Sequence, residues 1–369
     1  MRICIVTESF LPQVNGVTNS TLRLLEHLKS NCHKALVVAP SGSVDDYLGF
    51  PVIHMPSVHL KRFGDVRVAM PLSQVIKQIF EFRPDVIHLA SPALMGYYVA
   101  KKADQLGVPT VGVFQTDLAG FAKHYGLGLS RKAIWRWVSR IHRNVDRTLA
   151  PSRSSCEDLK NLSVPNVYLW QRGVDTDLFN PQKRNQELRE KFPNKHIVGY
   201  VGRLANEKRV SDLVEISNRS DIQLVIVGDG PARTELESMM PNAYFTGMLK
   251  GDSLASKIAS LDCFIHTGPN ETFCQAVQES LSSGVPTIAV NQGGPKDLIN
   301  HGKNGLLINT TDSVELNDAV NQTLHPSNWA NFSENARKSV EHRSWKMIME
   351  QLFDHYEEVI EARKFKVAA

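Results

Sequence analysis

The chain has 369 residues, which is more than one ordinary hydrophobic core holds, so two domains of the usual ~100 to 200 residues are expected. Its net charge of +4 arises in the first half, because residues 1–180 carry 21 Lys and Arg against 14 Asp and Glu. No stretch approaches the ~18 apolar residues of a membrane helix, and the five cysteines lack framework spacing, so we expect a cytoplasmic protein with reduced thiols and no nucleic-acid partner.

Short apolar runs alternate with longer segments of helical periodicity along the whole chain. The runs are Ile3 to Thr7, Ala35 to Ala39, Val86 to Leu89, Thr110 to Phe114, Ile197 to Val201, Gln223 to Val227, Cys263 to His266 and Thr287 to Val290. This alternation is typical of parallel sheets covered by helices. We therefore predict an α/β protein with two Rossmann-like domains that face each other across a cleft.

The boundary between the two domains is predicted in the segment 171–181, which Gly173 and Pro181 punctuate. The first domain is then 1–170 and the second 182–344. The last segment, 345–363, has apolar residues at helical spacing and is expected to form a helix that crosses back to the first domain. Those residues are Met349, Leu352, Phe353, Tyr356 and Ile360.

The segment 131–147 concentrates the basic charge of the first domain, with six Lys and Arg and the two tryptophans Trp135 and Trp137. One interpretation is a helix that rests on an anionic membrane surface. The other is a core helix with a solvated basic face.

In the first domain, Gln115, Thr116 and Asp117 end a predicted strand and place polar groups at the carboxyl edge of the sheet. Asp117 could orient or deprotonate an incoming hydroxyl. His88 lies one strand away and is interpreted as a structural residue. Gly16 is either a turn residue or a point where backbone N–H groups approach an anion.

In the second domain, Arg203 and Lys208 follow a predicted strand and lie near a helix start, a combination that suits a diphosphate. The alternative is a set of surface charges around Glu207. The sequence has neither Gly-x-Gly-x-x-Gly nor a Gly-Lys-Ser/Thr phosphate loop, which disfavours a dinucleotide dehydrogenase. No Cys/His cluster has metal spacing, so no metal site is predicted.

Glu271 and Glu279 are separated by seven residues after the apolar run 263–266. Glu271 is expected on the loop that leaves the strand, and Glu279 two turns into the next helix, so the pair frames a pocket where α/β sheets bind ligands. Two carboxylates could form an acid/base pair. Opposite two cations, they are better explained as holding the two ends of one extended ligand.

Taken together, these motifs resemble the retaining nucleotide-sugar glycosyltransferases of family 4, which have the two-domain GT-B fold and need no metal. The matching segments cover nearly the whole chain: 7–18, 114–117, 150–152, 172–175, 201–208, 227–231 and 271–279. Within the family, the chain looks most like GDP-mannose-dependent α-mannosyltransferases of actinobacterial lipid and lipoglycan pathways, with sulfoquinovosyl-diacylglycerol synthases as near relatives.

The resemblance implies roles for individual residues. Arg203 and Lys208 would hold the diphosphate, Glu271 the sugar hydroxyls and Glu279 the ribose hydroxyls. The implied nucleotide-sugar site is completed by Gly16, Leu249, Phe273, Cys274, Gly293 and Gly294. The implied catalytic residues are Arg203, Lys208, Glu271 and Asp117, and the acceptor side is formed by Gln115, Thr116 and Asp117. Many family members have a histidine where this chain has Gln115, so the acceptor-side role of that histidine cannot be assigned to this position.

The implied reaction is retaining transfer of a mannosyl group from GDP-mannose to a lipid-linked or glycolipid acceptor at the inner face of the membrane. The departing phosphate itself would take the proton of the acceptor. No metal or other cofactor is expected. The alternatives are a UDP-sugar-dependent transferase that glucosylates or sulfoquinovosylates a diacylglycerol-type lipid, a nucleotide-sugar epimerase, and a non-catalytic nucleotide-sugar binder.

Overall fold

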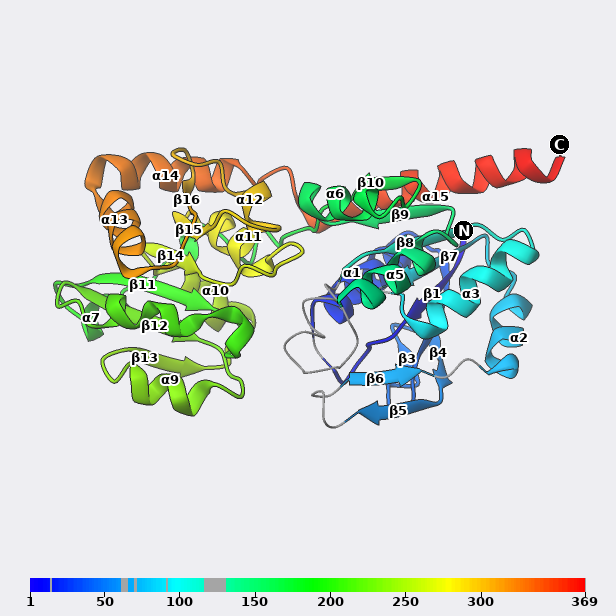
Figure 1. Ribbon diagram of the computed structural model, residues 1–369, viewed down its shortest axis with the longest axis horizontal. Coiled ribbons are helices and arrows are strands. Elements are labelled where there is room, and N and C mark those ends of the chain that lie inside the picture. The colour runs from blue at the N-terminus through cyan, green and yellow to red at the C-terminus, as the bar shows by residue number, and fades with distance from the viewer. Residues whose placement is uncertain (14, 61–65, 70–71, 91, 116–130, 369) are drawn as a thin grey trace. The chain divides into compact units, whose positions relative to one another are not determined.

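The computed structural model describes residues 1–368 except 14, 61–65, 70, 71, 91 and 116–130. The chain forms two compact units, Met1–Arg172 with Lys346–Ala369 and Gly173–Trp345. Each unit has a mostly or fully parallel β-sheet flanked by helices, which confirms the predicted pair of Rossmann-like units (Figure 1).

The first unit is built on an eight-stranded sheet in the order β10-β9-β8-β7-β1-β2-β4-β3. All neighbouring strands are parallel except β3 and β4, and a separate antiparallel pair consists of β5 and β6. The strands are β1 Arg2–Thr7, β2 Lys34–Pro40, β3 Asp46–Tyr47, β4 Phe50–Met55, β5 Ser57–Leu60, β6 Val66–Ala69, β7 Val86–Ala90, β8 Thr110–Val113, β9 Arg147–Ala150 and β10 Val167–Leu169.

Helices α1 Gly16–Ser30, α2 Ser73–Glu81, α3 Leu94–Gln105, α5 Arg131–His142 and α6 Arg153–Asn161 also belong to this unit. Helix α1 begins after Asn15, whose side chain accepts hydrogen bonds from the N–H groups of Val17 and Thr18. This cap satisfies two N–H groups that the helix itself cannot pair.

Helix α15 (Trp345–Ala368) returns to the first unit, as predicted. Its buried face includes Leu352 and Tyr356, both 0% exposed. The Tyr356 hydroxyl lies 2.8 Å from Nδ1 of His88 on β7. Burial lowers the pKa of His88 to about 3. His88 is therefore a neutral structural partner of α15, in agreement with its interpretation from the sequence.

The second unit has a six-stranded parallel sheet in the order β13-β12-β11-β14-β15-β16. Its strands are β11 His196–Val201, β12 Ile222–Val227, β13 Tyr244–Gly247, β14 Cys263–His266, β15 Thr287–Val290 and β16 Gly305–Ile308. Its helices are η1 Pro181–Lys183, α7 Glu187–Lys191, η2 Asn206–Lys208, η3 Val210–Leu213, α8 Val214–Ser217, α9 Arg233–Met239, α10 Gly251–Ala259, α11 Gln275–Ser282, α12 Pro295–Leu298, α13 Ser313–Leu324 and α14 Pro326–Lys338.

The strand order of this sheet reverses direction between β11 and β14. From β11 the chain builds outward through β12 and β13, and from β14 it builds to the other side through β15 and β16. In open parallel sheets, the loops at the carboxyl ends of two such strands diverge and leave a crevice that binds ligands. The loops after β11 and β14 are therefore the expected place for a site.

A buried carboxylate fixes the start of β11 and β14. One oxygen of Asp262 accepts from Arg184 Nη2 at 2.9 Å and from the guanidinium of Arg189, and the other accepts from the Ile197 N–H at 2.8 Å. The side chain of Asp262 is only 8% exposed. Two cations and one backbone N–H thus compensate the buried charge.

Within the described residues, no helix combines the length and the apolar character needed to cross a membrane.

Candidate functional site

Lys208 and Glu271 meet at the point where the strand order reverses. Lys208 ends η2 in the loop after β11, Glu271 lies in the loop after β14, and the Lys208 ammonium donates to Oε1 of Glu271. Thr267 ties the two loops together, because its hydroxyl donates to the Lys208 carbonyl at 2.7 Å. The structure therefore brings together a predicted diphosphate-binding cation and the carboxylate predicted to hold sugar hydroxyls.

Both groups of this pair are charged at neutral pH. Burial would raise the pKa of the Glu271 carboxyl, but His266 and Lys208 beside it lower the pKa to about 2. Burial would lower the pKa of the Lys208 ammonium, but Glu271 raises it. The two side chains keep 23% and 18% exposure, so a ligand can reach them from solvent.

His266 and Cys274 complete this cluster, and sequence reasoning gave His266 no role. His266 ends β14, its side chain is 3% exposed, and its Nε2 lies 3.4 Å from Oε1 of Glu271. Burial would lower the pKa of the imidazole, but Cys274 and Glu271 raise it. Cys274 precedes α11 with a φ of +79°. One polar atom each of His266, Glu271 and Cys274 lies within 4.8 Å of the other two.

Gly293 and Gly294 pack directly against the loop that carries Glu271. Gly294 N–H donates to the Glu271 carbonyl at 2.7 Å. Gly293 has a φ of +64°, and a Cβ there would lie 2.5 Å from the Glu271 carbonyl oxygen. A Cβ at Gly294 would lie 2.3 Å from the Phe273 Cα. Both positions therefore require glycine to let the two backbones approach, and the approach fixes the place of Glu271.

Three other predicted residues either pair with a different partner or pack in the core. Arg203 is 46% exposed and forms an ion pair with Glu207. Phe273 is 3% exposed and belongs to the hydrophobic core of the second unit, and Leu249 packs against the same core. On the loop after β11, Arg203 thus pairs with Glu207, as the surface-charge interpretation expects, whereas Lys208 pairs with Glu271.

Glu279 lies on α11 and has a different environment from Glu271. Burial raises the pKa of its carboxyl to about 8, against an opposing hydrogen bond with Gln275. Glu271 is ionised and paired with a cation, whereas Glu279 is protonated at neutral pH. Because the two carboxyls have different partners and different protonation states, they are better explained as contacts to two parts of one ligand than as an acid/base pair that shares a proton.

The raised pKa of Glu279 predicts how stability depends on pH. Between about 4.5 and 8, the folded protein keeps a proton that the unfolded chain loses, so this carboxyl lowers stability as pH rises through that window. Glu279→Gln removes the effect. We expect the variant to gain about 2 kcal/mol over the wild type between pH 5 and pH 8, because the side chain keeps some solvent contact and one pKa unit is worth about 1.4 kcal/mol. Thermal unfolding at several pH values measures this, and parallel curves for the two proteins would contradict it.

In the first unit, Arg172 connects Gly16 and Gln115. Its Nη2 donates to the Gly16 carbonyl at 2.9 Å and to the side-chain oxygen of Gln115, which also accepts from Ser20 Oγ at 2.9 Å. A Cβ at Gly16 would lie 2.7 Å from Nη1 of Arg172. The motif that begins at Arg172 was noted in the sequence, but the residue received no role. Thr116 and Asp117, predicted on the acceptor side, lie outside the described residues.

Comparison with family models divides the chain into two matches. Residues 14–178 match the model described as Glycosyltransferase Family 4, and residues 181–339 match the model described as Glycosyl transferases group 1. A GDP-mannose-dependent α-mannosyltransferase of Corynebacterium glutamicum is 47% identical, with 98% of this chain and 89% of the relative covered. The sulfoquinovosyl transferase of Arabidopsis thaliana is 31% identical, with 94% and 71% covered.

Solved structures show the same fold at lower sequence identity. HepE of Anabaena in complex with UDP superposes with a TM-score of 0.81 at 19% identity, with 97% of this chain and 100% of that chain covered. The sucrose-phosphate synthase of Thermosynechococcus elongatus superposes with a TM-score of 0.79 at 18% identity, with 98% and 99% covered. From the full-length relatives and the shared GT-B fold, we conclude that the chain belongs to glycosyltransferase family 4.

Proposed function

We propose that the protein transfers a mannosyl group from GDP-mannose, with retention of configuration, to a lipid-linked or glycolipid acceptor. The observation that carries the proposal is the Lys208–Glu271 ion pair at the strand-order reversal of the second sheet. The choice of GDP-mannose is supported by three relatives named as GDP-mannose-dependent α-mannosyltransferases, which are 44–47% identical over nearly the whole chain.

In this proposal, each of these side chains binds one part of the nucleotide sugar. The diphosphate competes with Glu271 for the Lys208 ammonium and gains Arg203 as a second cation, while the sugar hydroxyls donate to the ionised Glu271. The protonated Glu279 can both donate to and accept from ribose hydroxyls. As the glycosidic bond breaks, negative charge grows on the β-phosphate, and in this proposal the Lys208 ammonium stabilises it.

Thermal-shift titration with GDP-mannose, UDP-glucose and UDP-sulfoquinovose tests the choice of sugar donor. A ligand at about 100 times its dissociation constant stabilises a folded protein by roughly 2.7 kcal/mol. We expect the largest shift with GDP-mannose. A shift with only a UDP-sugar would favour the UDP-dependent alternative, and no shift with GDP-mannose would exclude it as the donor. Turnover of the sugar nucleotide without any acceptor would instead indicate an epimerase.

We also propose that transfer requires no metal ion, since Lys208 and Arg203 supply the positive charge that a divalent ion would otherwise bring to the diphosphate. Dialysis against a chelator is then expected to leave the transfer rate unchanged. A rate that falls on dialysis and returns with Mg²⁺ or Mn²⁺ would contradict this.

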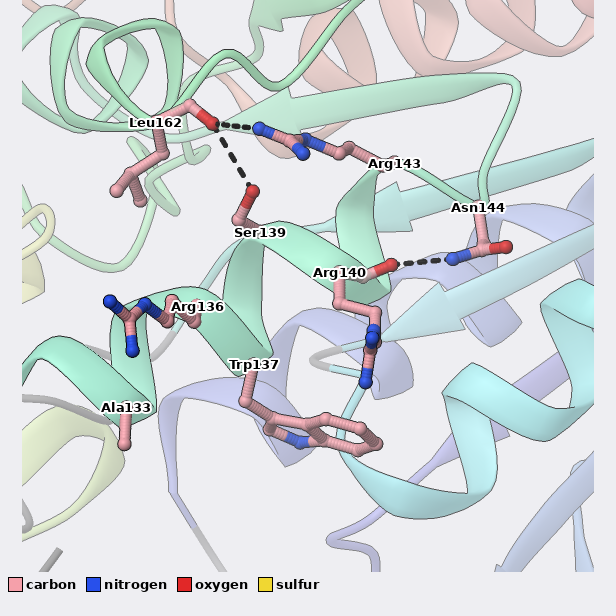
Figure 2. A pocket seen from close by; sticks show the side chains of 8 residues that line it. All are labelled: Ala133, Arg136, Trp137, Ser139, Arg140, Arg143, Asn144 and Leu162. Atoms are coloured by element: carbon pink, nitrogen blue, oxygen red, sulfur yellow. Dashed lines mark hydrogen bonds between the residues drawn. The ribbon is translucent and has the colours of Figure 1, made fainter.

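We propose further that helix α5 contacts an anionic membrane surface at which the acceptor is held. Lys132, Arg136 and Arg140 are exposed on this helix and Arg143 is exposed directly after it, whereas Val138 and Ile141 form the buried face of the helix. Figure 2 shows Arg136, Arg140 and Arg143 among the residues that line a pocket on this side of the unit. The volume of this pocket is about 570 Å³. Trp135 stacks on Phe114 and Trp137 packs against Tyr97, so the interaction would rest on the arginines. Anionic lipid surfaces attract such residues by ~1 kcal/mol each.

Co-sedimentation with vesicles tests the membrane contact. We expect binding to vesicles that contain phosphatidylserine, weaker binding at high salt, and little binding to neutral vesicles. The double variant Arg136→Gln, Arg140→Gln is expected to bind about 10-fold or more weakly, since it loses two of these attractions. Lys34→Gln with Lys101→Gln, which removes the same charge from exposed positions elsewhere in the unit, serves as the control. Equal losses in the two double variants would contradict a role for α5.

A further inference from the structure

We propose that His266, Glu271 and Cys274 form a binding site for a thiophilic divalent cation such as Zn²⁺, and that this ion inhibits the enzyme. Imidazole nitrogen, carboxylate oxygen and thiolate sulfur are the three ligand types that Zn²⁺ prefers in proteins. Here all three come together in one cluster, with their ligand atoms within 4.8 Å of one another. In the sequence, their spacing of five and three residues matched no metal motif.

The distances between the ligand atoms suit a tetrahedral ion. Zn²⁺ binds nitrogen and oxygen at about 2.0–2.2 Å and sulfur at about 2.3 Å, so two ligands of one tetrahedron lie roughly 3.3–3.8 Å apart. Nε2 of His266 is 3.4 Å from Oε1 of Glu271. The Sγ of Cys274 lies within 4.8 Å of a ligand atom of each of the other two residues, so binding the ion draws it closer by up to about 1 Å. Water would occupy the fourth position.

The ring of His266 is the strongest indication that this cluster accepts a ligand. His266 is 2% exposed; its Nε2 makes a long 3.4 Å ion-pair contact with Oε1 of Glu271, whereas no hydrogen bond to Nδ1 is found among the described residues. Buried polar groups are almost always satisfied, so such a nitrogen calls for an explanation. Tyr200 stacks on the ring with an interplanar angle of 8° and holds its orientation. A Cβ at Gly268 would lie 3.2 Å from Nε2, so glycine at this position keeps that side of the ring open.

The bound ion would take Glu271 away from Lys208. Both cations need the same carboxylate, because the Lys208 ammonium donates to the oxygen that faces His266. The thiol proton of Cys274 and the Nε2 proton of the His266 ring both pass to solvent as the metal–sulfur and metal–nitrogen bonds form. If the proposed function is correct, the metal-bound form has lost the carboxylate that holds the sugar and has a displaced Lys208. Inhibition by the ion rests on that function, whereas binding of the ion does not.

Titration of the reduced full-length protein with Co²⁺ tests the site directly, since a cobalt–thiolate bond produces a charge-transfer absorption and Zn²⁺ should displace it. We expect Cys274→Ser to abolish this absorption. Cys32→Ser, which removes an exposed thiol, is expected to leave it unchanged. Absence of the absorption in the wild type, or its loss with Cys32→Ser instead of Cys274→Ser, overturns the proposal.

Three further variants separate this site from nonspecific thiol binding. His266→Gln should weaken Zn²⁺ binding by at least about 10-fold through loss of a ligand, and Gly268→Ala should weaken it by closing the space beside Nε2. Lys208→Met should strengthen binding, because it removes the cation that competes for Glu271. Weaker binding in Lys208→Met, with the protein still folded by circular dichroism, would show that the ion does not use Glu271.

Competition with the nucleotide sugar tests inhibition. Zn²⁺ is expected to reduce the thermal shift produced by GDP-mannose in the wild type, and to have little effect on it in any variant that binds no metal but still binds the sugar nucleotide. If Co²⁺ binds but the shift with GDP-mannose is unchanged by Zn²⁺, the inhibitory role is wrong. If no nucleotide sugar shifts the metal-free protein, the proposed function fails while the cobalt result still decides the metal site.

Discussion

We expect Lys208→Ala to lower kcat/KM for glycosyl transfer by about 10²- to 10³-fold, the range seen when one preorganised electrostatic group is removed from a transition state. Lys208 is the cation that the structure places at the strand-order reversal, and Glu271 holds its ammonium in position before any substrate arrives. Charge on the departing diphosphate is larger in the transition state than in the bound donor. The loss should therefore affect kcat more than donor binding.

The variant also leaves the Glu271 carboxylate without its cation, so folding must be measured beside activity. Lys208→Arg, which keeps the charge, should recover part of the rate. Lys338 offers a matched control, because this lysine also forms an ion pair in the second unit but is 62% exposed. Lys338→Ala is expected to change kcat/KM by less than about twofold. Full turnover in Lys208→Ala would show that the ion pair is structural only.

The largest effect on stability is expected from Asp262→Ala. This carboxylate is 8% exposed and accepts from two arginines and from the N–H of Ile197. Its removal leaves Arg184 and Arg189 without their shared anion and leaves a backbone donor unsatisfied at the start of β11. We expect a loss of about 3 kcal/mol, at the lower end of the cost of breaking a buried pair because both arginines are about one-third exposed.

For a unit of this size, that loss corresponds to a fall of about 6–12 °C in melting temperature, which calorimetry can detect. Asp252→Ala is the control, since Asp252 pairs with Lys183 but is 80% exposed. Its expected effect is below about 1 kcal/mol. Similar melting temperatures for the two variants would mean that the Asp262 interactions do not determine the stability of the second unit.

Much of the fold follows from short-range pattern. The buried strands of the second unit are continuous apolar runs, so the expected run 263–266 coincides with β14 and the run 287–290 with β15. β9 and β16 were not predicted, although they are as long as β14 and β15, because each begins with a residue that is not typical of a buried strand, Arg147 in β9 and Gly305 in β16. The ion pair of Arg147 with Glu358 of α15 exists only in the folded first unit.

The candidate site was predictable where a motif carries its chemistry and unpredictable where chain topology does. Glu271 and Lys208 were singled out from their neighbours in the sequence, but their pairing depends on β11 and β14 being adjacent strands. In the sequence, His266 is simply the last residue of a predicted strand. Its place in a cluster of possible metal ligands appears only in the structure, where the turn before α11 brings Cys274 close to it. Arg172 likewise acquires its role from contacts with residues more than fifty positions away.

The return of α15 to the first unit has a consequence for the order in which the protein matures on the ribosome. The second unit, Gly173–Trp345, is synthesised before α15 exists and can complete its own core at that stage. The first unit is translated earlier, yet Leu352, which covers part of its surface, and Tyr356, the hydrogen-bond partner of His88, are synthesised only with α15. The first unit thus emerges from the ribosome first but completes its fold last. A chain that terminates before Tyr356 leaves this unit incompletely folded and therefore accessible to chaperones and proteases.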